Sequence, residues 1–249
     1  MIDLIGPRGL GDAIYVRAMA MRWLELGQPV TVFTIWPEVF DGIDVTVKSP
    51  TERTGNENIY HCVICSHCRL PDVVPVCVFD RICHQAGLFE PFEFKIDWKV
   101  KKPDMVNKIK RRSDGRKIMI YQPPKVANGF EQTLFNPHAD DFIRYLEAHS
   151  DFYRIKVGHP LTAHELKGAP CEMDIFGHTS VSDVFDIATI CDLFFSQVSY
   201  LVTLGEAMNK NVACMVTRRQ LEANSVRVRQ LTPAIFFCKH HLVEVVNVE

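Results

Sequence analysis

The sequence lacks a strong excess of charge of either sign, and it lacks a long apolar run. Its 28 Lys and Arg residues nearly balance 30 Asp and Glu residues, and the formal net charge is −2. No global attraction therefore draws the chain to nucleic acid or to anionic lipid. Uncharged stretches such as 193–205 are too short to span a bilayer. The first residues also lack the basic start and apolar core of a secretory signal. We expect a cytoplasmic protein without a transmembrane segment.

Two common nucleotide-binding motifs are also missing. No Walker motif occurs in the chain. Gly9-Leu10-Gly11 is followed by Ile14, where a dinucleotide-binding fingerprint has its third glycine. A nicotinamide-dependent dehydrogenase is therefore not expected.

The chain has nine cysteines, an odd number that suits a reducing compartment better than a disulfide scaffold. Cys62, Cys65 and Cys68 lie close together and have the side-chain chemistry that zinc prefers. The matching second pair is missing unless Cys77, Cys83 or His84 supplies it. On a strand, Cys62 and Cys65 would also face opposite sides. We therefore predict no metal site, with a zinc site built on the cysteine cluster as the alternative.

Apolar strands alternate with helical segments along the chain, which is typical of an α/β fold with mainly parallel sheets. In the first half we predict strands at 2–5, 30–34, 45–47 and 61–65, and helices at 12–26 and 78–86. In the second half we predict strands at 118–121, 154–157, 173–176, 193–195 and 212–216, and helices at 140–148, 181–190 and 200–208.

A strongly basic segment, residues 99–117, separates these two runs of strands and helices. Because the same alternation restarts after it, we predict two Rossmann-like domains, residues 1–98 and 118–249, joined by a basic linker or surface segment. The two domains are expected to face each other across a cleft. Open α/β sheets bind their ligands at the carboxyl ends of the strands, and so the cleft is the expected site.

A glycine turn follows the N-terminal strand and leads to Asp12 at the start of the next helix. Small residues let a ligand approach the backbone, and the free N–H groups of a first helical turn attract anions. Asp12 is therefore either a helix cap or a catalytic carboxylate.

Two further turns in the second half combine hydroxyl side chains with a helix start. Thr179 and Ser180 precede the helix at 181–190, where either can cap the helix or hold a phosphate. From these residues alone, a plain cap is the favoured interpretation. Ser196 and Ser199 follow the strand at 193–195 and form a second candidate site for an anion or a sugar.

The order of these motifs resembles glycosyltransferase family 9, the heptosyltransferase-like family of the GT-B fold. The resemblance covers most of the chain and rests on order rather than on one specific motif. It includes Asp80-Arg81 and Ala86-Gly87-Leu88, where the family has a similar Arg and Gly-Leu. It implies a metal-independent glycosyltransferase that uses a nucleotide-diphosphate sugar as co-substrate, needs no cofactor and acts on an acceptor hydroxyl, such as that of a cell-surface saccharide.

The resemblance also implies roles for individual residues. Asp12 matches the acid of the family's Gly-Asp motif, its proposed general base, which takes the proton of the acceptor hydroxyl. Lys125 either neutralises the diphosphate leaving group or is a solvated loop lysine. The implied acceptor-side residues are Arg8, Gly9 and Gly11. The implied donor-binding residues are Gln122, Lys125, Gly158, His159, Thr179, Ser180, Ser196 and Ser199.

The chain departs from the family pattern at two places. Val198, Tyr200 and Thr203 stand where the family has Asp, Gly and His, and Gln122-Pro123-Pro124 replaces its His-Pro-Gly. Two alternatives therefore stay open. One is a DNA glycosyltransferase that acts on a hydroxymethylated base, which the basic segment suggests. The other is a non-catalytic nucleotide-binding module with a decayed transferase fold.

Overall fold

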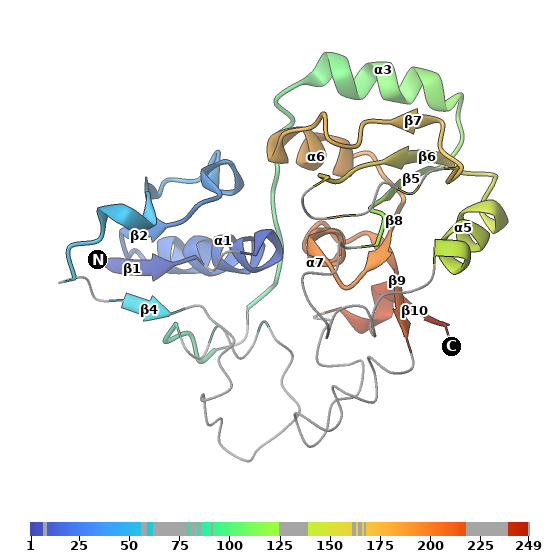
Figure 1. Cartoon of the computed structure of the whole chain (residues 1–249). Helices are drawn as coiled ribbons and strands as arrows, with labels where there is room; N and C mark the ends of the chain where they lie inside the picture. The colour runs from blue at the N-terminus through green and yellow to red at the C-terminus, as the bar shows by residue number, and fades with distance from the viewer. Residues whose placement is uncertain are drawn as a thin grey trace.

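The computed structural model describes residues 1–6, 9–55, 59–61, 79, 83, 86–90, 92–124, 139–160, 163, 166, 168–217 and 239–248. The described residues form two separate parallel sheets with helices packed around them (Figure 1). The predicted α/β class with parallel strands is thereby confirmed. No described helix has the length and apolar character needed to cross a membrane.

The first sheet has four parallel strands in the order β3-β2-β1-β4. Its strands are β1 (Ile2–Ile5), β2 (Val30–Phe33), β3 (Thr46–Lys48) and β4 (Ile59–His61). Helix α1 (Leu10–Glu25) joins β1 to β2, and short 3-10 helices η1 (Pro37–Phe40) and η2 (Pro50–Glu52) flank β3. The predicted strand at 61–65 overlaps β4 at one residue only, because β4 ends at residue 61 and 62–65 lie outside the described residues.

The second sheet has six parallel strands in the order β10-β9-β8-β5-β6-β7. They are β5 (Ile118–Tyr121), β6 (Tyr153–Lys156), β7 (Met173–Asp174), β8 (Leu193–Gln197), β9 (Asn211–Thr217) and β10 (Val243–Val248). The helices are α5 (Ala139–Ala148), α6 (Val181–Ala188) and α7 (Tyr200–Ala207), and η4 (His240–Leu242) precedes β10. Every strand predicted for this half is present, whereas β10 was not predicted.

The basic segment 99–117 is more ordered than a simple linker. Residues Pro103–Ser113 form helix α3, which packs against α6 along the outer side of the second sheet (Figure 1). Val106 and Ile109 supply its buried side, and the cationic side chains stay exposed. Pro103 suits the first turn, and Asp114 ends the helix in the left-handed conformation. The domain boundaries themselves remain a prediction.

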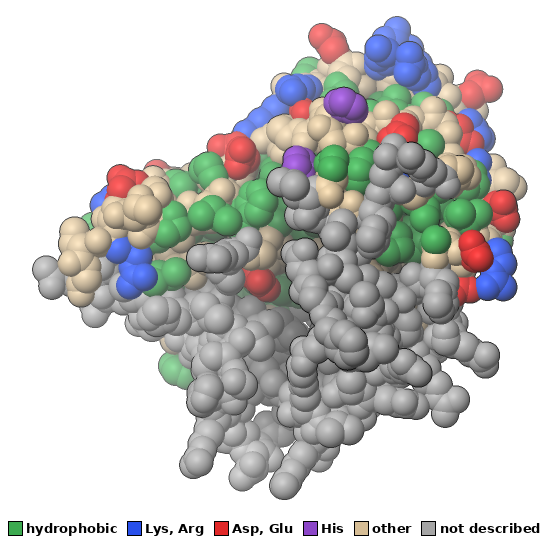
Figure 2. Space-filling model, viewed as in Figure 1, with side chains coloured by type: hydrophobic (Ala, Val, Ile, Leu, Met, Phe, Trp, Pro, Cys, Tyr) green, Lys and Arg blue, Asp and Glu red, His purple; other side chains and the backbone are tan. Residues whose placement is uncertain are grey.

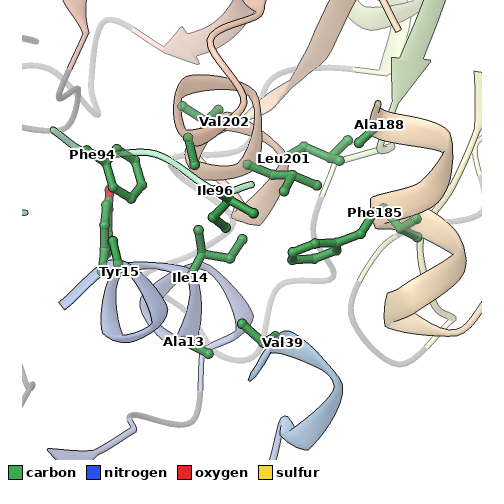
Figure 3. Close-up of a cluster of buried hydrophobic side chains, with 14 of the residues drawn as sticks. Ala13, Ile14, Tyr15, Val39, Phe94, Ile96, Phe185, Ala188, Leu201 and Val202 are labelled. Atoms are coloured by element: carbon green, nitrogen blue, oxygen red, sulfur yellow. The ribbon is translucent and has the colours of Figure 1, made fainter. Parts of the chain in front are cut away.

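One apolar core extends from the first sheet to the second. Figure 3 shows Ile14 of α1, Ile96 of the segment between the sheets and Phe185 of α6 pointing toward one another, beside Leu201 of α7. These side chains are almost fully buried. A second cluster, which includes Tyr121, fills the opposite face of the second sheet.

The segment between the sheets, which we call the crossing segment (residues 92–102), is tied to α6 by one buried carboxylate. Asp186 is fully buried, and its oxygens accept hydrogen bonds from Trp98 Nε1 (2.7 Å) and from the backbone N–H groups of residues 101 (3.0 Å) and 102 (2.7 Å). The backbone N–H of Ile96 also donates to Ala207 O of α7 (2.9 Å). The crossing segment is thus part of the packed structure.

On the other side, Arg17 of α1 holds the same region. Its Nη1 donates to the backbone oxygens of Val39 (2.6 Å) and Asp41 (2.9 Å), and its guanidinium lies 5.7 Å from the centre of the Trp98 ring. Burial lowers the pKa of Arg17 to about 10, against the opposing effect of Asp41 and Asp97. The side chain therefore remains charged at neutral pH.

The Asp186 anchor yields a stability prediction. Asp186→Asn keeps the size of the side chain but replaces one acceptor oxygen by an NH₂ group that faces existing donors. We expect a loss of about 2–3 kcal/mol in the free energy of unfolding, measured by urea denaturation. Asp114→Asn is the matched control, because Asp114 is exposed and Asn tolerates its left-handed backbone. Equal stability of the two variants would contradict the anchoring role.

Candidate functional site

Each sheet reverses its winding direction beside its first strand. β1 lies between β2 and β4, and β5 lies between β6 and β8, so that the chain first builds one side of each sheet and then the other. Such switch points leave a crevice outside the carboxyl ends of the strands, where open α/β sheets bind ligands. The turn after β1 and the turns after β5 and β8 are therefore the candidate site.

The first turns of α1 and α7 bring these two switch points together. Figure 1 shows α1 between the strands of the first sheet and α7, and these two helices are in contact. A Cβ atom on Gly11 would lie 3.3 Å from both Tyr200 Cα and Thr203 Oγ1. Gly11, predicted as an acceptor-side residue, therefore permits a close helix–helix approach at the site.

Asp12 is half-buried and is the third residue of α1, which begins two residues earlier than predicted. Its carboxylate lies over the exposed helix start, because a Cβ on Gly9 would be 2.5 Å from Asp12 Oδ2. A carboxylate there is favoured by the helix dipole. The position fits the structural role of an N-terminal acid and also places the carboxylate at the switch point of the first sheet.

Buried polar side chains gather at the carboxyl ends of β5 and β8. Ser196 and Ser199 are 1% and 8% exposed, and their Oγ atoms are 2.8 Å apart. Ser196 Oγ donates to Gln197 O (2.7 Å), so in this pair Ser199 is the donor. Ser199 Oγ also accepts from Leu201 N (3.2 Å) and thereby caps α7. Both hydroxyl protons are engaged within the protein, and the backbone N–H of Val202 donates to Ser199 O (3.1 Å).

The start of α6 is capped more completely than the start of α7. Ser180 Oγ accepts from Asp183 N (3.1 Å), and Ser180 N donates to Asp183 Oδ2 (3.1 Å), which is a capping box. Burial alone would raise the pKa of Asp183, but hydrogen bonds from Lys102 and Ser180 hold it below its ordinary value. The favoured cap interpretation of Ser180 is confirmed.

This difference ranks the two helix starts as anion sites. Asp183 places a negative charge in the first turn of α6, whereas the first turn of α7 has no acidic residue. A helix N-terminus attracts anions through its free N–H groups and its dipole. The start of α7 is therefore the better position for a phosphate.

Gly158, His159 and Thr179 lie at the carboxyl ends of β6 and β7, in two turns joined by a hydrogen bond from Gly177 N to Gly158 O (2.8 Å). His159 is exposed and Thr179 is half-buried. Gly158 has φ of 132°, and a Cβ there would lie 2.9 Å from the Phe176 ring and 3.5 Å from Gln122 Cγ. Gln122 thus contacts this group from the end of β5.

Several predicted residues cannot be placed. Arg8, Lys125 and the cluster Cys62, Cys65 and Cys68 lie outside the described residues. Among the residues that the structure describes, no three His, Cys, Asp or Glu side chains are grouped as metal ligands. A surface hollow of about 260 Å³ at the far end of α1, lined by Arg22, Glu25 and Lys95 among others, contains none of the predicted residues.

The sequence analysis placed a candidate anion site at the start of α7 but missed the packing of α7 on α1. Tyr200 and Thr203 entered only as departures from a family pattern, yet a Cβ on Gly11 would meet both. Thr203, a polar residue among the apolar residues Leu201, Val202 and Leu204, was the available signal. The buried Asp186, flanked by apolar residues in α6, was a similar signal for the anchor of the crossing segment.

Three solved structures show which fold this is. A glycosyl transferase family 9 protein from Veillonella parvula matches with a TM-score of 0.66 at 10% identity, over 99% of this chain and 85% of that chain. The E. coli ADP-heptose LPS heptosyltransferase II matches with a TM-score of 0.63 at 12% identity, over 100% and 90%. The E. coli heptosyltransferase WaaC with ADP matches with a TM-score of 0.57 at 7% identity, over 100% and 93%.

These similarities establish a heptosyltransferase-like fold for nearly the whole chain, as the motif order suggested. No family model and no curated protein sequence matches. At such low identity the likeness concerns the fold, and the residues of the site have to be judged on their own geometry.

The cap of α7 yields a prediction for the site. Ser199→Ala removes the acceptor for Leu201 N and the partner of Ser196, and we expect it to cost about 1 kcal/mol of stability. In a chain of this size that lowers the melting temperature by about 2–4 °C. Ser199→Thr keeps the hydroxyl and should recover most of the loss in a thermal melt. An equal drop for both variants would show that the cap is not the cause.

Proposed function

We propose that the chain is a nucleotide-sugar-dependent glycosyltransferase with two GT-B-type domains. The second half would bind the nucleotide-diphosphate sugar at the ends of β5 and β8, and the first half would bind the acceptor. The shared fold supports this proposal, because one similar structure is named a family 9 glycosyl transferase and two are named heptosyltransferases, one of them for ADP-heptose. The expected cytoplasmic location is part of the same proposal.

One observation carries the proposal. The first turn of α1, which bears Asp12, packs directly on the first turn of α7, which lacks an acid. A carboxylate from one half and an anion-attracting helix start from the other therefore border the same region. A transferase needs a base for the acceptor and a positive environment for the departing diphosphate, and these two groups supply them.

In the proposed reaction, Asp12 takes the proton of the acceptor hydroxyl as its oxygen bonds to the anomeric carbon. The bond from that carbon to the diphosphate breaks, and the diphosphate leaves with the electron pair. The positive end of the α7 dipole stabilises its growing negative charge. Lys125 is proposed as the cation that allows this step without a metal.

The acceptor is proposed to be a saccharide hydroxyl, and one observation favours DNA as a second candidate. Helix α3 exposes Lys108, Lys110, Arg111 and Arg112. Figure 2 shows Lys and Arg side chains gathered at the top of the view, where Figure 1 places α3. Mass analysis of DNA containing hydroxymethylated bases, after incubation with protein and donor, separates the two acceptors.

Donor binding is tested first. Thermal melts with ADP, UDP and GDP, and with ADP-glucose, UDP-glucose and GDP-mannose, should show one nucleotide series raising the melting temperature. Binding without release of nucleoside diphosphate in the presence of acceptors would favour the non-catalytic module. Failure of all six compounds to bind would overturn the proposed function.

The base is tested with Asp12→Asn. We expect the turnover number to fall by about 10²–10⁴-fold while the dissociation constant of the donor stays the same, because the variant keeps the shape and loses the proton acceptor. Asp44→Asn, an exposed acid in the same half, is the control. Unchanged turnover in Asp12→Asn, measured as release of nucleoside diphosphate, would rule out the base role.

A further inference from the structure

Helix α3 and the residues beside it concentrate positive charge in a chain that is otherwise acidic. Residues 99–117 contain nine Lys and Arg side chains and two Asp side chains, whereas the whole chain has a formal net charge of −2. A charge of +7 in this segment is thus set against −9 in the rest of the chain. Such an asymmetry indicates a partner of negative charge that is met locally, because the overall charge attracts none.

The cations within α3 have no acid beside them. Three of the nine cations in the segment form ion pairs, and these three lie outside the helix: Lys101–Asp41, Lys102–Asp183 and Arg116–Glu172. Those of the helix itself are all exposed, and none forms an ion pair with a residue that the structure describes: Lys108, Lys110, Arg111 and Arg112. We call these four side chains the cationic face of α3.

The cationic face points away from the body of the protein. Val106 and Ile109 form the buried side of α3, which packs against α6. Lys108 lies three and four residues before Arg111 and Arg112, so these three side chains share the opposite side of the helix. Figure 2 shows Lys and Arg side chains gathered at the top of the view, where Figure 1 places α3 at the outer edge of the molecule.

The stability of the helix does not by itself account for this face. The helix dipole favours cations in the last turn, which suits Lys110, Arg111 and Arg112. Lys108 lies before that turn and faces Arg111 and Arg112 at spacings where like charges repel each other. The folded chain thus contains a repulsion that an anionic partner would relieve.

Helix α3 also runs from the edge of the second sheet where the candidate site lies to the opposite edge. It begins directly after Lys102, which pairs with Asp183 in the first turn of α6, and α6 starts at the carboxyl ends of the strands. It ends at residue 113, and residues 114–117 lead to the amino end of β5. A flat surface that contacts the cationic face therefore also borders the edge of the sheet where the site lies.

A layer of anionic lipid headgroups fits this geometry better than a nucleic acid does. Single strands stack their bases on aromatic side chains, and residues 99–117 contain none. A duplex groove admits a helix that projects from its protein, whereas α3 lies lengthwise on α6 (Figure 1). A plane of headgroups can contact all four cations at once. No exposed residue of α3 has a large apolar side chain, which indicates contact with the headgroups rather than insertion between the acyl chains.

We propose that the cationic face of α3 binds the anionic headgroups of a phospholipid membrane and holds the candidate site beside that surface. The inference rests on the proposed function for its purpose, because a transferase held in this way would meet a lipid-linked saccharide acceptor. The hydroxyl of such an acceptor lies near the headgroups and would reach the site along the membrane surface. Lipid binding itself does not require sugar transfer, so the two proposals can fail separately.

The experiment measures sedimentation of the full chain with two kinds of vesicle, one of phosphatidylcholine alone and one of phosphatidylcholine and phosphatidylglycerol in equal amounts. The test variant replaces three cations of the face by glutamine, a good helix former without charge: Lys108→Gln, Arg111→Gln and Arg112→Gln together. The matched control makes the same change in charge at three exposed cations outside α3: Lys48→Gln, Arg53→Gln and Lys95→Gln together.

We expect the wild type to bind only the vesicles that contain phosphatidylglycerol. The test variant should bind them about 100-fold more weakly, equivalent to about 2.7 kcal/mol, while the control variant binds nearly as well as the wild type. Raising the salt from about 0.1 M to about 1 M shortens the screening length from about 10 Å to about 3 Å and should abolish binding. If the test variant has a lower melting temperature, Lys108→Gln alone should still weaken binding by about fivefold.

Several results would overturn the inference. They are failure of the wild type to bind the anionic vesicles, equal binding to both kinds of vesicle, and equal weakening in the test and control variants. Tighter binding of duplex DNA than of anionic vesicles at the same phosphate concentration would also overturn it, and would favour the DNA acceptor. The melts with nucleotides test the proposed function separately: vesicle binding by a chain that binds none of the six compounds would retain the membrane surface and overturn the transferase.

Discussion

The close contact between the first turns of α1 and α7 is the constraint on which the site depends. It exists because residue 11 is a glycine: any larger side chain would meet the backbone of Tyr200 and the hydroxyl of Thr203. Helix α1 follows β1, and α7 follows β8, and both strands lie at the switch points of their sheets. The contact between the two helices therefore fixes where the two switch points lie relative to each other. The apolar core beneath them then continues from one sheet into the next.

Two helix starts that meet in this way place like partial charges side by side, which costs free energy unless something negative lies between them. Asp12 compensates the end of α1, and Asp183 does the same for α6, but the first turn of α7 has no acid of its own. The starts of α1 and α6 are thus compensated by acids of their own first turns, and the start of α7 is not. The hydroxyls of Ser196 and Ser199 are bonded to each other, and Ser199 also caps α7 by accepting from Leu201 N. The role of this pair is therefore to stabilise the start of α7.

Local patterns predicted the parts of this molecule that are decided locally. The strand at 118–121, the helix that carries Asp12 and the cap at Ser180 follow from apolar runs and from residue types at helix starts. Helix α3 was not predicted, because its few apolar residues, Met105, Val106 and Ile109, gain their significance only from packing in the folded protein. The contact of Gly11 with α7 joins residues that lie far apart in the sequence, and no local pattern reveals it. The lack of a donor for Gln122 Oε1 among the described residues depends on every group around that atom in the folded protein, which a local pattern does not reveal either.

The packing of the crossing segment limits which parts of the protein can be exchanged with those of another protein. Phe94 and Ile96 are buried in the shared core, while Trp98 and the backbone at 101–102 bind Asp186 of α6. A chimera that exchanges the first sheet for that of another protein with this fold must therefore retain residues 92–102 with the half that contains α6 and α7. A junction near residue 90 keeps Asp186 and its hydrogen-bond donors in the same piece. A junction at the start of α3 separates them and exposes apolar side chains that are buried in the intact protein.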